Sequence, residues 1–438
     1  MPERENHLSQ ILSRAEFGAR AAAVEALSAV LRRHQALDEA LDHDGLDERD
    51  RAFARMLLAT ALRRRGQVDD LLARCLERPL HSRAALAEDI LRLGITQLMF
   101  LDTPPHAAVD TAVAMARASG MEGMAKLINA VLRRLSREGA AMLAEQDAEK
   151  LNTPGWLWDS WCAAYGEEAC RAIARAHLQE ASLDVSVKGD AAAWAERMEA
   201  SLLSSGTVRR PPGGMVSGLP GYDEGGWWVQ DVAAALPAKL LGDVQGKWVA
   251  DLCAAPGGKT AQLAAAGAQV IALDRSAKRL QRLTANLDRL GLSAELVTAD
   301  AAQWKPTELL DAVLLDAPCS ATGTLRRHPD AAWLKAPEDV AKLAITQARL
   351  LNAAVAMLKP GGLLIYCTCS LQPEEGAAQI EALLASGAPV RRVPVQPDEI
   401  GGWAELITPA GDLRTLPYHH QEIGGMDGFF AARLERLP

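Results

Sequence analysis

The 438-residue sequence contains no apolar run of the roughly 18 residues that a membrane-spanning helix requires. Its first residues, MPERENHLSQ, also lack the apolar core of a signal peptide. Cysteine is scarce, and an odd number of cysteines at scattered positions does not indicate a disulfide framework. We therefore expect a cytoplasmic protein without a membrane partner, whose thiols are free for chemistry. The seven cysteines are Cys75, Cys162, Cys170, Cys253, Cys319, Cys367 and Cys369.

The sequence also lacks an excess of positive charge, since its formal net charge is −9. This balance argues against a broad positive surface for a polyanionic partner. It does not exclude such a partner, because phosphate groups respond to local basic patches rather than to net charge. Any nucleic acid would therefore bind along a confined basic track.

The chain is longer than most single hydrophobic cores, so two or three domains are expected. From about residue 10 to 138 the apolar positions, such as Val24, Leu27 and Leu31, follow helical spacing. The TPPH stretch at residues 103–106 breaks this pattern between two helices, because proline cannot continue a helix. The predicted division is a helical domain at 1–140, a connecting subdomain at 141–235 and a catalytic domain at 236–438.

The connecting subdomain has a mixed pattern. It begins with a tryptophan-rich helical segment and continues with a short alternating strand, SLDVSVKG, and a long Pro/Gly-rich loop. The three tryptophans could stack on nucleic-acid bases, but at this spacing packing within a helix is the commoner use. They are Trp156, Trp158 and Trp161.

From residue 236 apolar strands alternate with helices, which predicts a doubly wound, mostly parallel α/β sheet. Ligands of such sheets bind beyond the carboxyl ends of the strands. The unusual side chains of this domain fall at those ends, so we expect them along one edge. They are Cys253, Asp274, Asp300, Asp316, Cys319 and the residues from Cys367 to Ser370.

Two nucleotide-binding patterns are absent from this domain. The turn CAAPGGKT ends like a phosphate-binding loop, but its first required glycine is replaced by Cys253, and no GxGxxG occurs. A small-residue turn remains, followed by Asp274, which can hold both hydroxyls of a ribose, and by Asp300, which can meet an adenine amino group. An adenosine ligand without pyrophosphate fits, and S-adenosylmethionine is one. Alternatively, Asp274 only caps the helix that begins near Ser276.

The cysteines at the strand ends allow three interpretations. A zinc site is disfavoured because paired CxxC or Cys/His spacing is missing, so no metal is expected. Inert packing, the commonest fate of a free thiol, suits Cys367 and Cys253. Cys319 and Cys369 instead follow their strands among polar residues, where they can face each other across one pocket. Beside a methyl donor, one thiolate could add to carbon 6 of a pyrimidine and activate carbon 5. This scheme also needs an acid and a base, and the two cysteines and Asp316 supply groups of these types.

The motifs CAAPGGKT, DAPCSATGTLRRHPD and YCTCSLQPEE, with VQDVAAAL and DGFFAARL, resemble those of the RNA cytosine carbon-5 methyltransferases, the NOL1/NOP2/Sun family. The resemblance covers residues 225–438 and implies a Rossmann-like class I S-adenosylmethionine-dependent methyltransferase domain. It also implies that RNA rather than DNA is the partner. The cofactor-binding residues would be Cys253, Ala254, Ala255, Pro256, Gly257, Gly258, Lys259, Asp274, Asp300 and Asp316.

The same resemblance assigns the catalytic roles. The nucleophile would be Cys369 of the TCS motif, while Cys319 of the PCS motif would assist release of the product. Asp316 and Lys259 would contact the cytosine. Two departures from the family pattern occur: Ala321 stands where glycine is common, and LDVSVKG replaces a strand that usually ends in Arg-Val-Asn, which puts some RNA contacts in doubt.

The helical region is similar to the NusB-like RNA-binding domain, through RAAAVEALSAVL, LRLGITQLMFLDTPPHAAVDTAVAMA and INAVLRRL. Its fusion to the catalytic domain resembles the bacterial enzymes of this family that act on small-subunit ribosomal RNA. Arg14 and Arg20 would then contribute to an RNA-binding face, unless they are merely solvated. Arg326, Arg327 and His328 would meet RNA phosphates, unless they only form surface ion pairs.

We therefore expect a monomeric methyltransferase that forms 5-methylcytosine in 16S ribosomal RNA through a covalent cysteine adduct. One alternative within the same chemistry is a methyltransferase that forms 5-methylcytosine in transfer RNA. Two rivals belong to other classes: a non-catalytic RNA-binding factor of the NusB type, and an S-adenosylmethionine enzyme with a protein or small-molecule substrate. The first would not explain two thiols beside a cofactor turn, and the second needs no TCS thiol.

Overall fold

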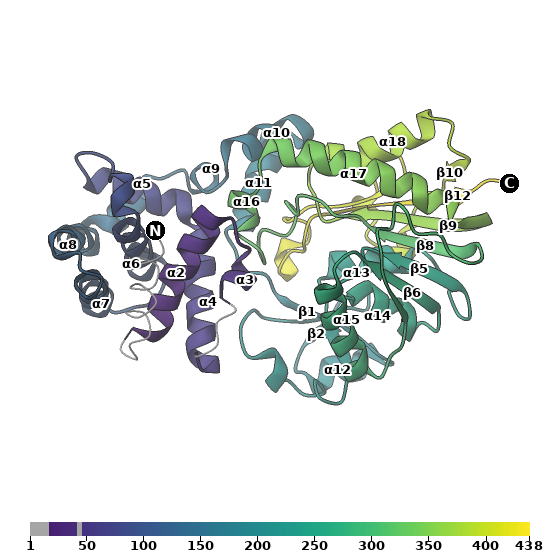
Figure 1. The fold of residues 1–438 in the computed structure, drawn as a ribbon, viewed down its shortest axis with the longest axis horizontal. Helices are drawn as coiled ribbons and strands as arrows, with labels where there is room; N and C mark the ends of the chain where they lie inside the picture. Colours follow the sequence, from purple (N-terminus) through teal and green to yellow (C-terminus); the bar gives the residue numbers. More distant parts are fainter. Residues whose placement is uncertain (1–16, 42–45) are drawn as a thin grey trace. The chain divides into compact units, whose positions relative to one another are not determined.

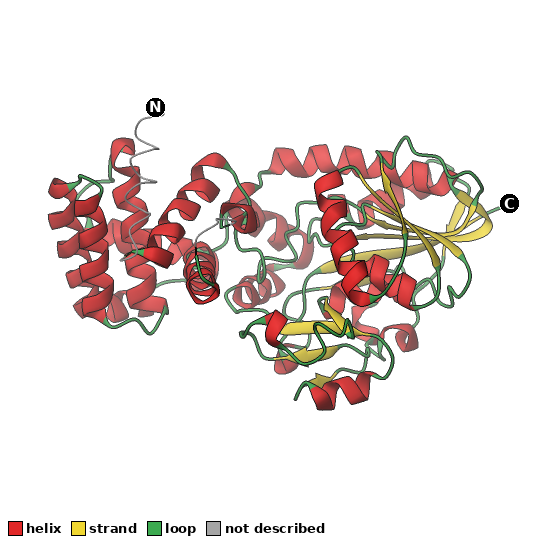
Figure 2. Cartoon of the chain, turned by 60° about the horizontal axis from the view of Figure 1, so that its bottom comes forward, coloured by secondary structure: helices red, strands yellow, loops and turns green. Residues whose placement is uncertain are grey.

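The computed structural model describes residues 17–41 and 46–438, and Figure 2 shows which parts are helical and which form sheets. The chain divides into two compact units. Unit 1 comprises Met1–Gln179 and Leu325–Lys335, and unit 2 comprises Glu180–Thr324 and Ala336–Pro438. The predicted three-part division at 140/141 and 235/236 stays a prediction. Within the described ranges, the longest apolar helices fall short of what a membrane crossing needs.

Unit 1 is helical, as the spacing of its apolar residues predicts. Alanine and leucine side chains such as Ala26, Leu27 and Leu58 fill its core. The predicted break is confirmed, since one helix ends at Phe100 and the next begins at Pro105, where a proline in the first turn costs no hydrogen bond. The helices are α2 (Gly18–Arg33), α3 (Leu37–Ala40), α4 (Glu48–Arg63), α5 (Arg65–Cys75), η1 (Ser82–Ala84), α6 (Ala85–Phe100), α7 (Pro105–Ala118), α8 (Glu122–Ala144), α9 (Ala148–Leu151), α10 (Gly155–Tyr165), α11 (Glu167–His177) and α16 (Ala331–Leu334).

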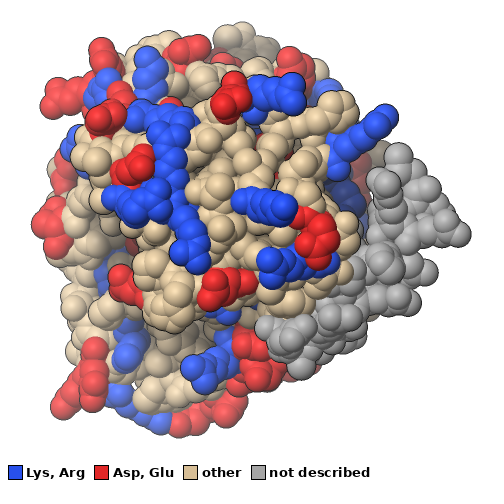
Figure 3. Space-filling view, turned by 90° about the vertical axis from the view of Figure 1, so that its left-hand side faces the viewer, with Lys and Arg blue, Asp and Glu red and all other residues tan. Residues whose placement is uncertain are grey.

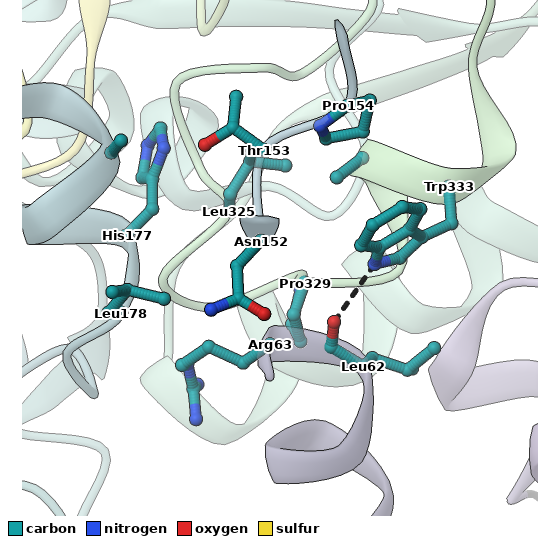
Figure 4. A pocket seen from close by; sticks show the side chains of 12 residues that line it. Leu62, Arg63, Asn152, Thr153, Pro154, His177, Leu178, Leu325, Pro329 and Trp333 are labelled. Atoms are coloured by element: carbon teal, nitrogen blue, oxygen red, sulfur yellow. Dashed lines mark hydrogen bonds between the residues drawn. The ribbon is translucent and has the colours of Figure 1, made fainter. Parts of the chain in front are cut away.

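The segment Leu325–Lys335 follows the PCS motif in sequence but packs in unit 1. The indole Nε1 of Trp333 donates to the carbonyl of Leu62 at 2.9 Å, as Figure 4 shows. The backbone N–H of Leu37 donates to the carboxylate of Asp330 at 3.0 Å. The guanidinium of Arg65 lies 4.5 Å from the centre of the Trp333 ring. The sequence pattern did not predict that this segment belongs to the helical unit.

The arginines expected to meet RNA have different surroundings. Arg326 is buried, so its side chain does not lie at the surface where the predicted contact with phosphate would form. Arg327 is half-buried and His328 is exposed. The side chain of Arg20 donates to Gln97 at 2.7 Å. Arg14 lies outside the described residues.

Unit 2 contains two sheets. The larger one has the order β10-β12-β9-β8-β5-β6-β7, with β11 paired to β12. Its strands from β5 to β9 are parallel, whereas β12 is antiparallel to β9 and β10. The predicted doubly wound sheet is therefore present, with an antiparallel edge. The strands are β5 (Trp248–Leu252), β6 (Gln269–Asp274), β7 (Glu295–Thr298), β8 (Leu310–Asp316), β9 (Leu358–Thr368), β10 (Val390–Arg392), β11 (Leu413–Thr415) and β12 (Phe429–Arg436).

Helices cover both faces of this sheet (Figure 1). One apolar cluster joins the strands to α13, α14 and α15, and includes Leu236, Leu263 and Leu283. The other joins them to α17 and α18, and includes Leu351 and Ile380. Burial on both faces explains why the strands read as continuous apolar runs. The helices are α13 (Val232–Lys239), α14 (Gly258–Ala265), α15 (Ala277–Leu290), α17 (Pro337–Ala356) and α18 (Ala377–Ala385), with the short turns η3 (Pro373–Glu375), η4 (Pro397–Ile400), η5 (Ala404–Leu406) and η6 (Gln421–Ile423).

The smaller sheet has the order β2-β3-β1-β4 and comes from the predicted connecting subdomain. The strand predicted from SLDVSVKG is confirmed as β1. Among the tryptophans of α10, Trp161 is fully buried and Trp158 lies under the Arg171 guanidinium, which supports packing rather than base stacking. The elements are β1 (Leu183–Val187), α12 (Ala191–Arg197), β2 (Ser201–Leu202), β3 (Val208–Arg210), η2 (Val216–Gly218) and β4 (Trp227–Val229).

Candidate functional site

The small-residue turn lies between β5 and α14. Cys253 follows the last residue of β5 with a φ of 63°, and α14 begins at Gly258. Gly257 has a φ of 104°, and a Cβ there would come within 2.7 Å of the Leu283 side chain. Only glycine therefore suits this position. The turn brings backbone N–H groups to the carboxyl end of the sheet, where a ligand of this fold would lie.

Asp274 lies at the end of β6, beside the turn. Its carboxylate accepts hydrogen bonds from the backbone N–H groups of Ser276 at 2.9 Å and Ala255 at 3.3 Å. Arg279 forms an ion pair with it at 3.2 Å. The cap of α15 is a different group, since the Ser276 side chain accepts from the backbone N–H of Arg279 at 3.3 Å. Asp274 thus ties the turn to β6, which a cap alone would not do.

Asp300 lies two residues beyond the end of β7, so this strand ends earlier than the sequence pattern suggested. Its carboxylate accepts from the backbone N–H of Ala302 at 3.0 Å and lies 3.5 Å from the Arg349 guanidinium. Nearly half of the side chain is exposed. Because Asp274 pairs with Thr298 in the sheet, both carboxylates follow the same edge. Two carboxylates and a glycine turn at this edge suit the ribose and adenine of S-adenosylmethionine.

Buried Lys259 and half-buried Asp316 form an ion pair at the end of β8, with Nζ 2.7 Å from Oδ2. Burial, the largest single effect, would lower the pKa of Lys259, but the charge and hydrogen bond of Asp316 and the other acidic groups nearby together outweigh it and raise this pKa. The ammonium also lies 4.8 Å from the centre of the Phe429 ring. Cys367 is buried, and its Sγ lies 3.6 Å from Asp316 Oδ1. The prediction that Cys367 is a packing residue is confirmed.

Cys319 and Cys369 face each other, with their Sγ atoms 3.4 Å apart. They follow the adjacent parallel strands β8 and β9, whose ends pair Asp316 with Cys367. Both thiols are partly exposed. The hydrogen bond with Cys369 and burial raise the pKa of Cys319 well above its usual range. The expected meeting of the two thiols in one place is therefore present, and the raised pKa favours the neutral form of Cys319.

Two buried carboxylates were missed by sequence reasoning. Asp251 of β5 accepts a hydrogen bond from the Thr260 hydroxyl at 2.6 Å, and burial raises its pKa to about 7. Glu375 is fully buried and bonds to the serines that follow both cysteines. The signal for Glu375 was present, since it belongs to the acidic pair of YCTCSLQPEE. Asp251 begins the DLCAAPGG stretch but reads as an ordinary strand residue.

The fold and the site define a class. A doubly wound sheet with a glycine turn, two carboxylates at the strand ends and an adjacent pair of thiols is the arrangement of a class I S-adenosylmethionine-dependent methyltransferase. Residues 238–435 match the family model of the 16S rRNA methyltransferase RsmB/F, and residues 18–137 match that of the NusB family. The chain belongs to the RsmB/F family of S-adenosylmethionine-dependent RNA methyltransferases.

Individual relatives are similar in sequence along nearly the whole chain. The ribosomal RNA small subunit methyltransferase B of Pseudomonas putida is 37% identical, over 95% of this chain and 98% of its own. The protein of the same name from Shewanella oneidensis is 35% identical over the same shares. The crystal structure of PH0851 has a TM-score of 0.74 and 22% identity, and covers 97% of this chain and 100% of its own. This last likeness concerns the fold alone.

The predicted fold class, a NusB-like helical domain followed by a Rossmann-like methyltransferase domain, is thereby confirmed, as are the enzyme class and the cofactor. The assignment of individual residues to catalysis and cofactor binding stays a prediction. The structure brings Cys319 together with Cys369, Lys259 with Asp316, and the Cys253–Gly258 turn with Asp274. Asp300 lies on the same edge without a contact to these groups.

Proposed function

We propose that the protein methylates carbon 5 of a cytosine in 16S ribosomal RNA, with Cys369 as the nucleophile. The observation that carries the proposal is the 3.4 Å approach of the Cys369 and Cys319 thiols at the ends of β9 and β8. Methylation of carbon 5 requires one thiol to add to the ring and a second group to manage its release. The names of the relatives support the choice of small-subunit ribosomal RNA.

The proposed steps use the groups that the site brings together. The Cys369 thiolate bonds to carbon 6 of the cytosine, and the ring electrons then move to carbon 5. S-adenosylmethionine, when bound, supplies the electrophilic methyl group that carbon 5 takes. A water molecule then takes the proton from carbon 5; the electron pair of that C–H bond forms the double bond between carbons 5 and 6, while the bond between carbon 6 and Sγ breaks and its pair leaves with the Cys369 thiolate. The neutral Cys319 thiol, 3.4 Å away, stabilises this leaving thiolate as a hydrogen-bond donor.

The Lys259–Asp316 pair holds the cytosine during these steps. Asp316 ends β8, on the segment that leads to Cys319, and the ammonium of Lys259 in α14 lies 2.7 Å from its carboxylate. A carboxylate can accept from the cytosine amino group, and an ammonium can donate to the ring carbonyl. All of these groups come from one chain, so the chemistry needs no second copy of the protein.

RNA must reach this site although the chain is acidic overall. On the face that Figure 3 displays, Lys and Arg side chains lie among Asp and Glu side chains and do not form one broad positive surface. Binding along a confined track of basic side chains is compatible with this distribution. Affinity for RNA should then fall as the salt concentration rises, because phosphate contacts release bound counterions.

The test uses methyl-labelled S-adenosylmethionine and either ribosomal or transfer RNA from cells that lack the enzyme. We expect label in 5-methylcytosine from ribosomal RNA only. Label confined to transfer RNA would keep the chemistry and contradict the substrate class. Absence of labelled 5-methylcytosine from both RNAs would contradict the proposed reaction.

Cysteine variants test the roles of the thiols. Cys369→Ala should abolish transfer, because it removes the sulfur proposed to attack carbon 6. Cys319→Ala should accumulate a covalent protein–RNA adduct on a denaturing gel, because release is impaired. Cys162→Ala, a half-buried thiol of α10, is the matched control and should behave as the unchanged protein. An active Cys369→Ala variant, or a Cys319→Ala variant without adduct, would show that the roles are wrongly assigned.

A further inference from the structure

Glu375 is a buried carboxylate whose hydrogen bonds lead to both cysteine segments. It ends the short turn η3, which follows β9, and its exposed fraction is 0%. An ionised group this deeply buried is costly unless hydrogen bonds satisfy it. The arrangement of those bonds therefore indicates what the carboxylate holds in place.

One group of bonds reaches the segment of the release thiol. The backbone N–H of Ser320, the residue after Cys319, donates to both carboxylate oxygens of Glu375, at 2.9 and 3.2 Å. The Ser320 hydroxyl also donates to Glu375. Gln347 of α17 donates to Glu375 at 3.1 Å and to the carbonyl of Pro318, the residue before Cys319, at 2.9 Å. The residues on either side of Cys319 are thus tied to one carboxylate.

A second group reaches the segment of the nucleophile. The hydroxyl of Ser370, the residue after Cys369, donates to Glu375 at 2.5 Å. The carbonyl of Glu375 accepts from the hydroxyls of Thr368 at 3.1 Å and Tyr366 at 2.8 Å. Glu375 is therefore joined to β9 and to the segments that follow β8 and β9, which carry the two thiols.

The two segments also contact each other directly. The hydroxyls of Ser320 and Ser370 lie 3.1 Å apart. The backbone N–H of Gly323 donates to the carbonyl of Cys369 at 2.9 Å. These bonds span residues that are about fifty positions apart in sequence, and the carboxylate lies at their centre.

We propose that Glu375 is a positioning residue that sets the distance and orientation of Cys369 relative to Cys319. The inference rests on the proposed function, since it concerns the two thiols that carry out that reaction. Glu375 does not touch the reacting atoms. It acts by fixing the serines beside the thiols, so its loss misplaces the attacking sulfur without removing a reacting group. A displacement of about 1 Å can slow an enzyme by roughly 100-fold.

The main variant is Glu375→Gln, which keeps the shape and removes the charge. An amide offers one acceptor oxygen where the carboxylate offers two, so the donors from Ser320, Ser370 and Gln347 cannot all be satisfied in their present positions. We expect kcat to fall by about 10- to 100-fold. The KM for RNA and the affinity for S-adenosylmethionine should stay within twofold, because the Glu375 side chain is fully buried and presents no surface to either ligand.

The matched control is Glu374→Gln, which changes the neighbouring acid of the same turn. Glu374 is exposed, and its backbone carbonyl accepts a hydrogen bond from the Gln379 side chain at 2.8 Å. This variant should keep full turnover. Equal loss in both variants would overturn the inference, because it would point to charge in the turn rather than to the buried bonds.

The attack step can be measured by itself in the Cys319→Ala background, where the adduct accumulates. Adding Glu375→Gln should slow adduct formation by the same factor by which kcat falls. An unchanged rate of adduct formation, or equal losses of cofactor affinity and turnover, would overturn the positioning role. If Glu375→Gln does not fold, Ser370→Ala replaces it, with an expected several-fold slower adduct formation; an unchanged rate would again be contradictory.

These outcomes are separable from failure of the proposed function. If Cys369→Ala remains active in the same assay, the proposed chemistry is wrong whatever Glu375→Gln does. If Cys369→Ala is inactive while Glu375→Gln turns over at the unchanged rate, the chemistry stands and only the positioning role is wrong.

Discussion

At the scale of single residues, the main departure from the family pattern has a conformational consequence. Ala321 lies two residues after Cys319 with a φ of 58°, in the left-handed region that L-residues with a Cβ adopt at a cost of about 1–2 kcal/mol. Glycine avoids this cost, although it loses about 0.5–1 kcal/mol through its freer unfolded chain. The loop beside the thiol is therefore strained by the alanine.

Ala321→Gly should raise the free energy of unfolding of unit 2 by up to about 1 kcal/mol. Turnover should stay within twofold, because the change removes no reacting group. Urea denaturation and a methylation assay measure the two quantities. The matched control is Ala285→Gly on the exposed face of α15, which should lower stability by about 1 kcal/mol. A loss of stability in Ala321→Gly would contradict the assignment of strain.

At the scale of elements, the sequence predicted what short-range patterns can encode. Apolar runs bounded by polar residues predicted the strands β5, β6, β8 and β9. The candidate residues Asp274, Cys319 and Cys369 were then predicted from their positions at or just beyond the ends of these strands. β7 is shorter than its apolar pattern, because Ala299 and Asp300 already belong to the turn that follows. The role of Glu375 could not be predicted, since its partner Ser320 is 55 positions away and only the folded sheet brings them together.

Asp251 links β5 to α14 through the Thr260 hydroxyl, and its pKa gives the link a pH dependence. Burial raises this pKa to about 7, from an ordinary value of 3.8. Between these values the folded protein keeps a proton that the unfolded chain has lost. The stabilisation from this group is therefore complete below pH 3.8. It is lost as the pH rises from there through about 7, and between these two pKa values the loss is about 1.4 kcal/mol per pH unit.

Asp251→Asn should remove this dependence, because the amide does not titrate. Denaturant unfolding at pH 5, 6, 7 and 8 should show that the free energy of unfolding of the variant increases relative to that of the unchanged protein as the pH rises. Asp288→Asn, at an exposed position of α15, is the control, and its free energy of unfolding should depend on pH as that of the unchanged protein does. Parallel curves for Asp251→Asn would mean that Asp251 is ionised throughout this range.

At the scale of the whole molecule, the chain passes between its two units three times, after Gln179, Thr324 and Lys335. Sequence order suggested a helical domain followed by a catalytic one. It could not show that Leu325–Lys335 returns to the helical unit, because this segment is continuous with the PCS motif and its pattern is too short to be read separately. Only its contacts with α3 and α4 reveal where it belongs.

The returning segment also encloses a buried histidine. The ring of His177 lies beside a small cavity that includes Leu325 and Trp333 (Figure 4), and its nitrogens have no hydrogen-bond partner in the part of the chain that the structure describes. Burial and the charges of Arg326 and Arg63 lower its pKa to about 3. The neutral ring is thus part of an apolar contact, and the stability that it gives unit 1 is lost as the pH falls from 6.5 towards 3.

Trp333→Ala tests whether this segment stabilises the helical unit. The change removes the hydrogen bond to Leu62, the contact with Arg65 and much of the cavity wall, so unit 1 should lose about 2–3 kcal/mol. Hydrogen exchange in the full chain should become faster in α4 and α11. Trp248→Ala, which removes a largely exposed tryptophan from β5, should leave both helices protected. If α4 and α11 exchange at unchanged rates in Trp333→Ala, the segment Leu325–Lys335 does not stabilise the helical unit, and that unit folds without it.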